Sequence, residues 1–117
     1  MQHDRRDAEA LGHQLRCDLA LISVGAVSAP GGYTTSNLSE AVMMGEMMER
    51  SGRVAILADS SKFTEPLFAQ IAELERADYL VTDAEPPAEL AEALQHAGVE
   101  VLVAGEETAS ERRLIGL

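Results

Sequence analysis

The sequence predicts an α/β domain built on a mostly parallel sheet of about four strands. Four short apolar runs, at residues 19–24, 54–58, 79–82 and 99–103, are each about as long as a strand. They are apolar nearly throughout instead of alternating, which is typical of strands covered on both faces. The segments between them have apolar residues at helical spacing. This alternation of strands and helices favours a parallel sheet.

The size and charge of the chain restrict its function. Its 117 residues suffice for one hydrophobic core, so we expect a single domain at residues 1–104 and a tail at 105–117. Nine basic and twenty acidic residues give a formal charge of −11, which would repel a nucleic-acid backbone. No apolar run is long enough for a membrane helix and no secretory signal is visible, so the expected location is the cytoplasm.

Two helices are expected before the second strand, and the second of them is the better marked. The first covers residues 5–15 and the second covers residues 38–50. Asn37 can cap the second helix while Glu40 reaches back to complete a capping box, and Gly52 stands where a left-handed residue would end the helix.

Two more helices are expected in the second half of the chain. The third begins near Glu65, with a proline in its first turn. Its inward-facing residues would be Leu67, Ile71 and Leu74. The fourth follows Pro86 and Pro87, and Gly98 ends it. Its apolar face would consist of Leu90, Leu94 and Ala97.

The second helix has apolar residues on two sides. One arc of about 160° is expected to face the sheet. It contains Leu38, Ala41, Val42, Met44, Gly45 and Met48. Met43 and Met47 lie outside this arc, one turn apart, and offer an adaptable apolar surface to a partner chain. The alternative is that they are scattered surface methionines.

The connection at residues 25–36 is the first candidate for a binding site. It has twelve residues, whereas connections in such domains usually have ~2–6. Ligands of open parallel sheets bind at the carboxyl ends of the strands, which is where this connection begins. Gly31 and Gly32 permit close approach of the backbone, and Thr34 leads towards a helix N-terminus that can hold an anion. The alternative is that these residues only turn the chain.

Asp59-Ser60-Ser61-Lys62 follows the second strand and is the sharper candidate. A single cation beside a carboxylate and two hydroxyls suits a polyhydroxylated anion, with Lys62 on the anionic group and Asp59 on the hydroxyls. The alternative is that Asp59 caps the next turn while Lys62 points to solvent. After the third strand, Asp83 either lines the same crevice or serves as a turn residue.

Other reactive residues give weaker signals. His3, His13 and His96 are widely separated and have no partners at zinc spacing, so no metal site is expected. Cys17 is the single cysteine, and with no identifiable base beside it we interpret it as a packing residue. No nucleotide-binding or hydrolase motif occurs, so we expect no cofactor and no enzymatic activity.

Three segments carry a family resemblance. They are Asp-Leu-Ala-Leu-Ile-Ser-Val-Gly-Ala-Val-Ser at 18–28 with Gly-Gly-Tyr-Thr at 31–34, Glu-Ala-Val at 40–42, and Val-Ala-Ile-Leu-Ala-Asp-Ser-Ser-Lys-Phe at 54–63. In these segments the chain resembles the carboxyl-terminal half of the sensor domain of DeoR-family transcriptional repressors. The resemblance covers residues 18–104, and the segment at 54–63 is its most specific part.

The resemblance implies both a fold and a ligand. The fold would be the Rossmann-like, three-layer fold shared with ribose-5-phosphate isomerase and CoA transferases. The module would bind a phosphorylated sugar or related metabolite. Separately from the resemblance, we expect the chain to form a homo-oligomer. The effector-binding residues implied are Gly25, Ser28, Gly31, Gly32, Thr34, Asp59 and Lys62.

Two departures from the family keep other functions open. A complete regulator begins with a winged helix-turn-helix and the opening strands of the sensor, and the sequence shows neither. The chain is therefore expected to be a partial sensor domain, either a fragment or a shortened stand-alone protein that lacks part of the pocket. The second helix carries methionines where family members tend to have basic residues. One alternative is an isomerase-like enzyme with Asp59 as general base. Another is an interaction module that pairs with a longer homologue.

Overall fold

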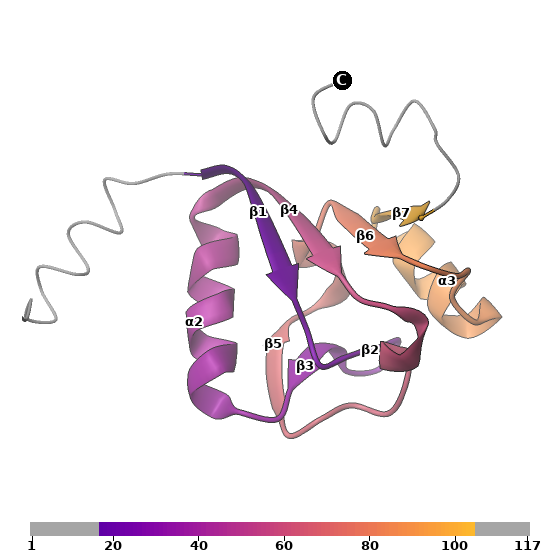
Figure 1. The fold of residues 1–117 in the computed structure, drawn as a ribbon, viewed down its shortest axis with the longest axis horizontal. Helices are drawn as coiled ribbons and strands as arrows, with labels where there is room; N and C mark the ends of the chain where they lie inside the picture. Colours follow the sequence, from indigo (N-terminus) through magenta and orange to yellow (C-terminus); the bar gives the residue numbers. More distant parts are fainter. Residues whose placement is uncertain (1–16, 105–117) are drawn as a thin grey trace, which may run out of the picture.

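The computed structural model describes residues 17–104, which form a mixed α/β domain with two sheets (Figure 1). The larger sheet is parallel and has the strand order β1-β4-β6-β7. Its strands are β1 Cys17–Ser23, β4 Ser51–Leu57, β6 Tyr79–Thr82 and β7 Glu100–Val103. The predicted α/β class and the parallel four-stranded sheet are confirmed.

The smaller sheet is antiparallel and was not predicted. Its order is β2-β3-β5, with β2 Ala26–Ser28, β3 Gly32–Thr35 and β5 Ala69–Ala72. The connection predicted at residues 25–36 is therefore largely a hairpin, and its strands are buried throughout.

The helix predicted from Glu65 is wrong. Residues 65–68 form an exposed loop, followed by strand β5 and the short 3-10 helix η2 Leu74–Arg76. The buried residues Ala69 and Ile71 alternate with exposed Gln70, which is the pattern of a strand with one covered face. Pairing of this segment with β3 overrides the helical spacing of Leu67, Ile71 and Leu74.

The other two helices within the described residues lie where they were predicted. Helix α2 Leu38–Glu49 begins with the Asn37 side chain accepting a 3.0 Å hydrogen bond from the Glu40 backbone N–H, as expected for an N-cap. The Glu40 carboxylate does not complete a capping box with Asn37, because it accepts from the Thr35 hydroxyl at 3.4 Å instead. Helix α3 Ala88–His96 follows Pro87, and Gly98 ends it with φ +78°.

Gly52 does not end α2, which corrects the prediction. The helix closes at Arg50, whose N–H donates to the Glu46 carbonyl, and Gly52 lies within β4. A Cβ on Gly52 would lie 3.2 Å from the Asp18 carbonyl oxygen, so the missing side chain serves the close approach of β1 and β4.

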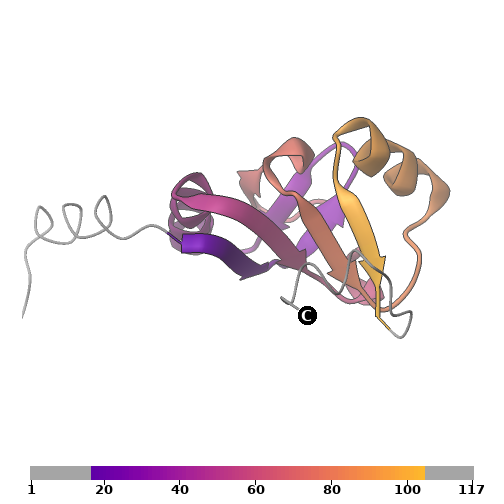
Figure 2. The same cartoon turned by 90° about the horizontal axis from the view of Figure 1, so that it is seen from above.

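Both helices and the antiparallel sheet lie on the same face of the parallel sheet (Figure 2). They share one core, which includes Ile22, Ile56 and Leu80 from the parallel sheet and Tyr33 and Leu94 from the opposing elements. On the other face, Leu21 is 58% exposed. Residues 17–104 therefore supply two of the three layers that were predicted.

Helix α2 is rotated relative to the prediction. Ala41 and Met48 are buried as expected, but Leu38 and Val42, expected to face the sheet, are 61% and 55% exposed. The helix packs closely on β5, since a Cβ on Gly45 would lie 3.2 Å from the Ile71 carbonyl oxygen. This contact turns Leu38 and Val42 outward, and Met43 and Met47 are exposed as predicted.

Several predictions fall on residues that the structure does not describe. They are the helix at 5–15, the tail at 105–117, His3 and His13. Within residues 17–104, no helix has the length and apolar character needed to cross a membrane.

Candidate functional site

The carboxyl ends of β1, β4 and β6 meet at one edge of the parallel sheet and enclose a crevice of about 390 Å³. We call it the carboxyl-edge crevice. Its lining residues are Ser23, Val24, Leu57, Ala58, Asp59, Lys62, Val81, Thr82, Asp83 and Ala104. The structure thus brings Asp59 and Lys62 together with Asp83, as expected for parallel strands that end at a common edge.

Asp59 caps the turn that carries Lys62. This turn is the 3-10 helix η1 Ser60–Lys62, and one Asp59 carboxylate oxygen accepts from the Ser61 backbone N–H at 2.9 Å and from the Ser61 hydroxyl. The Ser61 hydroxyl, followed by the Ser61 N–H, lowers the pKa of the exposed Asp59 carboxyl. Asp59 is therefore ionised at neutral pH, and within residues 17–104 no hydrogen bond reaches its Oδ2 oxygen.

Asp83 ties the same turn to the neighbouring strand. It follows β6, and its Oδ1 accepts from the Ser60 backbone N–H at 2.6 Å while its Oδ2 accepts from the Ser60 hydroxyl at 3.4 Å. Asp59 and Asp83 thus hold two consecutive N–H groups of η1.

Lys62 is the positive group of the crevice. The backbone N–H groups of residues 60–63 all have acceptors within the protein, so the turn has no free amide for an anion. The Lys62 side chain is half-buried and forms no ion pair with any residue between 17 and 104. An anion bound at this turn would therefore be held by the Lys62 ammonium group.

The other five predicted site residues belong to the β2–β3 hairpin and its entry, and none of them lines the carboxyl-edge crevice. The Gly31 N–H donates to the Ser28 hydroxyl at 3.0 Å, and the Gly25 N–H donates to the Thr34 carbonyl at 2.9 Å. The Thr34 hydroxyl accepts from the Leu67 N–H at 3.0 Å. Gly25 is the nearest of the five in sequence, because it directly follows the lining residue Val24.

The glycines of the hairpin make room for the loop that leads from η1 to β5. A Cβ on Gly25 would lie 2.6 Å from Leu67 Cδ1, and one on Gly31 would lie 2.7 Å from the Pro66 ring. Gly32 has φ +69°, and its Cβ would lie 2.5 Å from the Ala72 carbonyl oxygen. These glycines therefore have a packing role in the contact between the hairpin and residues 66–72.

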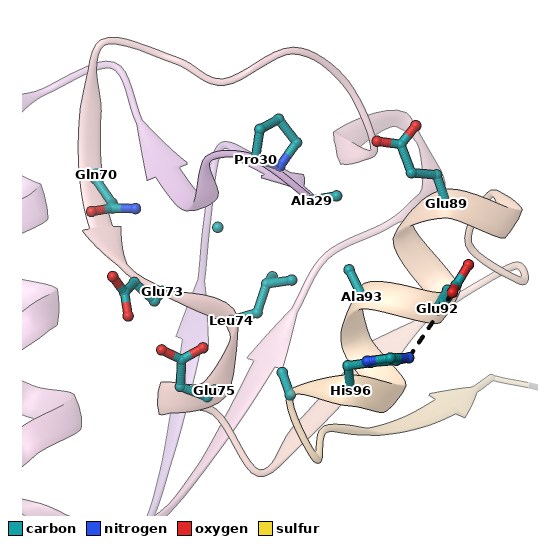
Figure 3. Close-up of a pocket in the computed structure, with 12 residues that line it drawn as sticks. Ala29, Pro30, Gln70, Glu73, Leu74, Glu75, Glu89, Glu92, Ala93 and His96 are labelled. Carbon is teal, nitrogen blue, oxygen red and sulfur yellow. Dashed lines mark ion pairs between the residues drawn. The ribbon is translucent and has the colours of Figure 1, made fainter.

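A cavity of about 620 Å³ lies elsewhere, between α3 and the antiparallel sheet with η2 (Figure 3). Glu89, Glu92 and His96 project from α3, and Glu73 and Glu75 lie opposite them. A side-chain hydrogen bond and charge repulsion between Glu73 and Glu75 raise the pKa of Glu73, and the same bond lowers the pKa of Glu75. Its four glutamates make this cavity unsuited to a phosphorylated ligand.

His96 lines that cavity beside a carboxylate of its own helix. Its ring lies 4.0 Å from the Glu92 carboxylate, one turn earlier on α3. Among residues 17–104 no group of three or more potential ligands could hold a metal ion. A cavity of about 430 Å³, which Pro30 also lines, is bordered by Ser28 and by Phe63, which directly follows Lys62.

Comparison with known proteins assigns this architecture to a family. The family described as the DeoR C terminal sensor domain matches residues 5–84, which is more than half of the chain. The chain belongs to this family. The sequence-based identification of a DeoR-family sensor domain is confirmed.

Individual DeoR-type relatives are transcriptional regulators by name. The chain is 35% identical over 89 residues to a protein of Escherichia coli O157:H7 named for repression of the aga operon, covering 76% of this chain and 33% of the relative. It is 35% identical to the HTH-type transcriptional regulator GlpR of Haloferax volcanii, covering 81% of this chain and 37% of the relative. It is 34% identical to the HTH-type transcriptional repressor GlcR of Bacillus subtilis, covering 77% and 34%. The chain thus spans about a third of the length of these relatives.

Sequence reasoning left the role of one crevice residue of this DeoR-type domain open. Asp83 precedes Ala84, Glu85 and two prolines, and from sequence it was equally well interpreted as a turn residue. Its position directly after a parallel strand was the available signal, because such positions face the crevice. Its contact with Ser60, 23 residues earlier, appears only in the folded structure.

Proposed function

We propose that this DeoR-family domain is the effector-binding module of a transcriptional repressor, and that its effector is a phosphorylated sugar or a closely related metabolite. The observation that carries the proposal is the carboxyl-edge crevice, which Asp59 and Lys62 line from the turn that follows β4, beside the end of the adjacent parallel strand β6. Lys62 would hold the anionic group and the free oxygen of Asp59 would accept from sugar hydroxyls. The names of the relatives support regulation as the setting.

We propose binding without chemical conversion of the sugar. An isomerase would need a general base with a pKa close to the working pH. Asp59, the obvious candidate, has its pKa lowered by its hydrogen bonds to Ser61, which makes it a weaker base. Effector binding would then act by favouring one of two arrangements of the whole regulator, in the cytoplasm.

The hairpin residues would contribute to this site indirectly. Gly25, Gly31, Gly32 and Thr34 hold the segment that runs from η1 to β5, and Ser28 holds Gly31. They would thereby fix the position of the segment that follows Lys62 in the sequence. We therefore propose that these five residues support the structure of the crevice. Of the five, only Gly25 is close enough in sequence to a lining residue to lie beside a bound effector.

Calorimetry with matched ligands tests the proposal. The ligands are ribose 5-phosphate, glucose 6-phosphate and fructose 1-phosphate, each beside its unphosphorylated sugar. Lys62→Ala should weaken binding of the phosphorylated sugars by about tenfold or more and leave the neutral sugars nearly unchanged. Arg53→Ala is the control, because it removes the same charge from the opposite end of β4. Equal losses for both ligand classes, or no binding of any of them to the wild-type domain, would contradict the proposal.

We also propose that the module forms a homo-oligomer. Support comes from four large apolar side chains on α2 that are exposed in the single chain, namely Leu38, Val42, Met43 and Met47. Light scattering of the wild type and of the Met43→Glu/Met47→Glu double variant tests this. A monomeric wild type, or an unchanged oligomer in the variant, would contradict the assignment to α2.

A further inference from the structure

Two aspartates fasten the segment of β4 to the two ends of β6. At the amino edge, Asp78 Oδ2 accepts from the Val54 N–H at 2.8 Å. At the carboxyl edge, Asp83 Oδ1 accepts from the Ser60 N–H at 2.6 Å. The contacts are of the same chemical kind, but only the second one holds a residue of the turn that carries Lys62.

The bond from Ser60 to Asp83 is the long-range attachment of this turn. The other backbone bonds of the turn are local: Lys62 N–H to the Asp59 carbonyl at 2.9 Å and Phe63 N–H to the Ser60 carbonyl at 3.2 Å. They shape the turn but do not fix it to the sheet. Ser60 is two residues from Lys62, so a shift of Ser60 would move the ammonium group relative to the crevice.

The charge of Asp83 has the opposite effect on an anionic ligand. Asp59, Lys62 and Asp83 line one crevice, which therefore holds two carboxylates and one ammonium group. A carboxylate near a phosphate raises the free energy of the bound state through repulsion. Substitutions of Asp83 can thus separate the effect of its hydrogen bond on binding from the effect of its charge.

We propose that Asp83 is a positioning residue of the effector site, which places Lys62 by holding Ser60 and at the same time limits the attraction of the crevice for anions. This inference rests on the proposed function of the crevice. The amide of asparagine keeps a carbonyl oxygen that can accept from Ser60 but has no charge, whereas alanine removes both.

The calorimetric experiment uses Asp83→Asn and Asp83→Ala with the same three sugar phosphates. Asp83→Ala should bind these ligands about tenfold more weakly than Asp83→Asn, because both variants lack the charge and only alanine lacks the acceptor for the Ser60 N–H. Asp83→Asn should bind at least as tightly as the wild type. Equal affinities of the two variants would overturn the positioning role, and weaker binding by Asp83→Asn than by the wild type would overturn the role assigned to the charge.

Asp78→Ala is the matched control, because it removes the equivalent contact from the far edge of the sheet. It should lower stability without changing sugar-phosphate affinity. Amide hydrogen exchange in the absence of ligand separates the two proposals. Asp83→Ala should accelerate exchange at Ser60 and Asp83→Asn should not, even if no sugar phosphate binds the wild type. An unchanged Ser60 exchange rate in Asp83→Ala would also overturn the inference.

Discussion

The hydroxyl of Tyr33 donates a 2.9 Å hydrogen bond to the backbone carbonyl of Leu74, 41 residues further along the chain. The Tyr33 side chain is completely buried, and this bond joins β3 to η2 beneath the parallel sheet. Burial raises the pKa of Tyr33 far above its ordinary value, and the charges of Glu75 and Asp78 add to the shift. The hydroxyl is therefore a neutral donor at every physiological pH.

Tyr33→Phe should lower the free energy of unfolding by about 1–3 kcal/mol, because it leaves the buried Leu74 carbonyl without its donor. Urea unfolding followed by circular dichroism measures the change. Tyr79→Phe is the control, since Tyr79 is only half-buried and its hydroxyl makes no hydrogen bond to another residue between 17 and 104. A loss in Tyr33→Phe no larger than in Tyr79→Phe would refute the importance of this bond.

Alanine substitutions at three glycines should destabilise the domain to different degrees. Gly98→Ala should cost about 1–2 kcal/mol, since its φ is left-handed but no atom lies within 4 Å of the new Cβ. Gly32→Ala should cost more, because a similar φ is combined with a backbone oxygen at 2.5 Å. Gly25→Ala should cost less than Gly32→Ala, because its closest contact is the movable end of the Leu67 side chain and its nearest backbone atom, the Thr34 carbonyl oxygen, is 3.2 Å away. Thermal unfolding of the three variants gives the order of their losses in stability. A larger loss in Gly98→Ala than in Gly32→Ala would be inconsistent with this geometry.

Alanine substitutions of two adjacent methionines on α2 should lower stability to very different degrees. Met48 is buried in the core, so Met48→Ala should cost about 2–5 kcal/mol. Met47 is exposed in the single chain, so Met47→Ala should change stability by no more than about 0.5 kcal/mol. Chemical denaturation at low protein concentration is the measurement. Similar losses in both variants would mean that the observed rotation of α2 is wrong.

Ser61→Ala should raise the pKa of Asp59, because the Ser61 hydroxyl is the main cause of its lowering. A carbon-detected NMR titration of the Asp59 carboxyl measures this pKa directly. Ser60→Ala is the matched control, since the Ser60 hydroxyl bonds to Asp83. The Asp59 pKa should be the same in Ser60→Ala as in the wild type, and a shift of equal size in both serine variants would disprove the assignment.

The hydrogen bond from the Ser61 hydroxyl to the Asp59 carboxylate also predicts a dependence of stability on pH. The Asp59 pKa is lower in the folded than in the unfolded chain, so its ionised form stabilises the fold above the unfolded-state pKa. That stabilisation is lost as the pH falls through the folded-state pKa. The difference in unfolding free energy between wild type and Ser61→Ala should thus be largest near neutral pH and shrink in acid. Urea titrations of both proteins near neutral pH and in acid measure this difference in unfolding free energy. A difference that grows in acid would contradict the expected direction of the pH dependence.

The sequence patterns that predicted structure correctly depend mainly on contacts between residues that are close together in the chain. Asn37 was recognised as an N-cap because its side chain needs only the N–H of Glu40, three residues away. The strands of the parallel sheet were visible as apolar runs of strand length, although the expected cover on both faces is not found within residues 17–104, where Leu21 is 58% exposed. Asp59 and Lys62 could be placed at one edge of the sheet from the parallel topology alone.

The features that were missed depend on contacts between distant segments. Gly-Tyr-Thr-Thr in β3 has too few residues for a clear period, and its strand exists because β5 pairs with it. Leu67 and Ile71 have the spacing of a helix, yet Leu67 is exposed and Ile71 belongs to β5. The distribution of the predicted site residues between the crevice and the hairpin follows from the same pairing, which no local pattern encodes.

The antiparallel sheet takes its strands from both sides of α2 and β4, and this order affects how the domain is made. Strands β2 and β3 leave the ribosome long before β5, so the β2–β3 hairpin, in which Val27 pairs with Tyr33, lacks its third strand until the chain has been synthesised through Ala72. Closing so long a loop costs chain entropy before any of the pairing energy is gained, which slows folding. The nascent domain therefore passes through a stage in which its most buried tyrosine is still exposed to water.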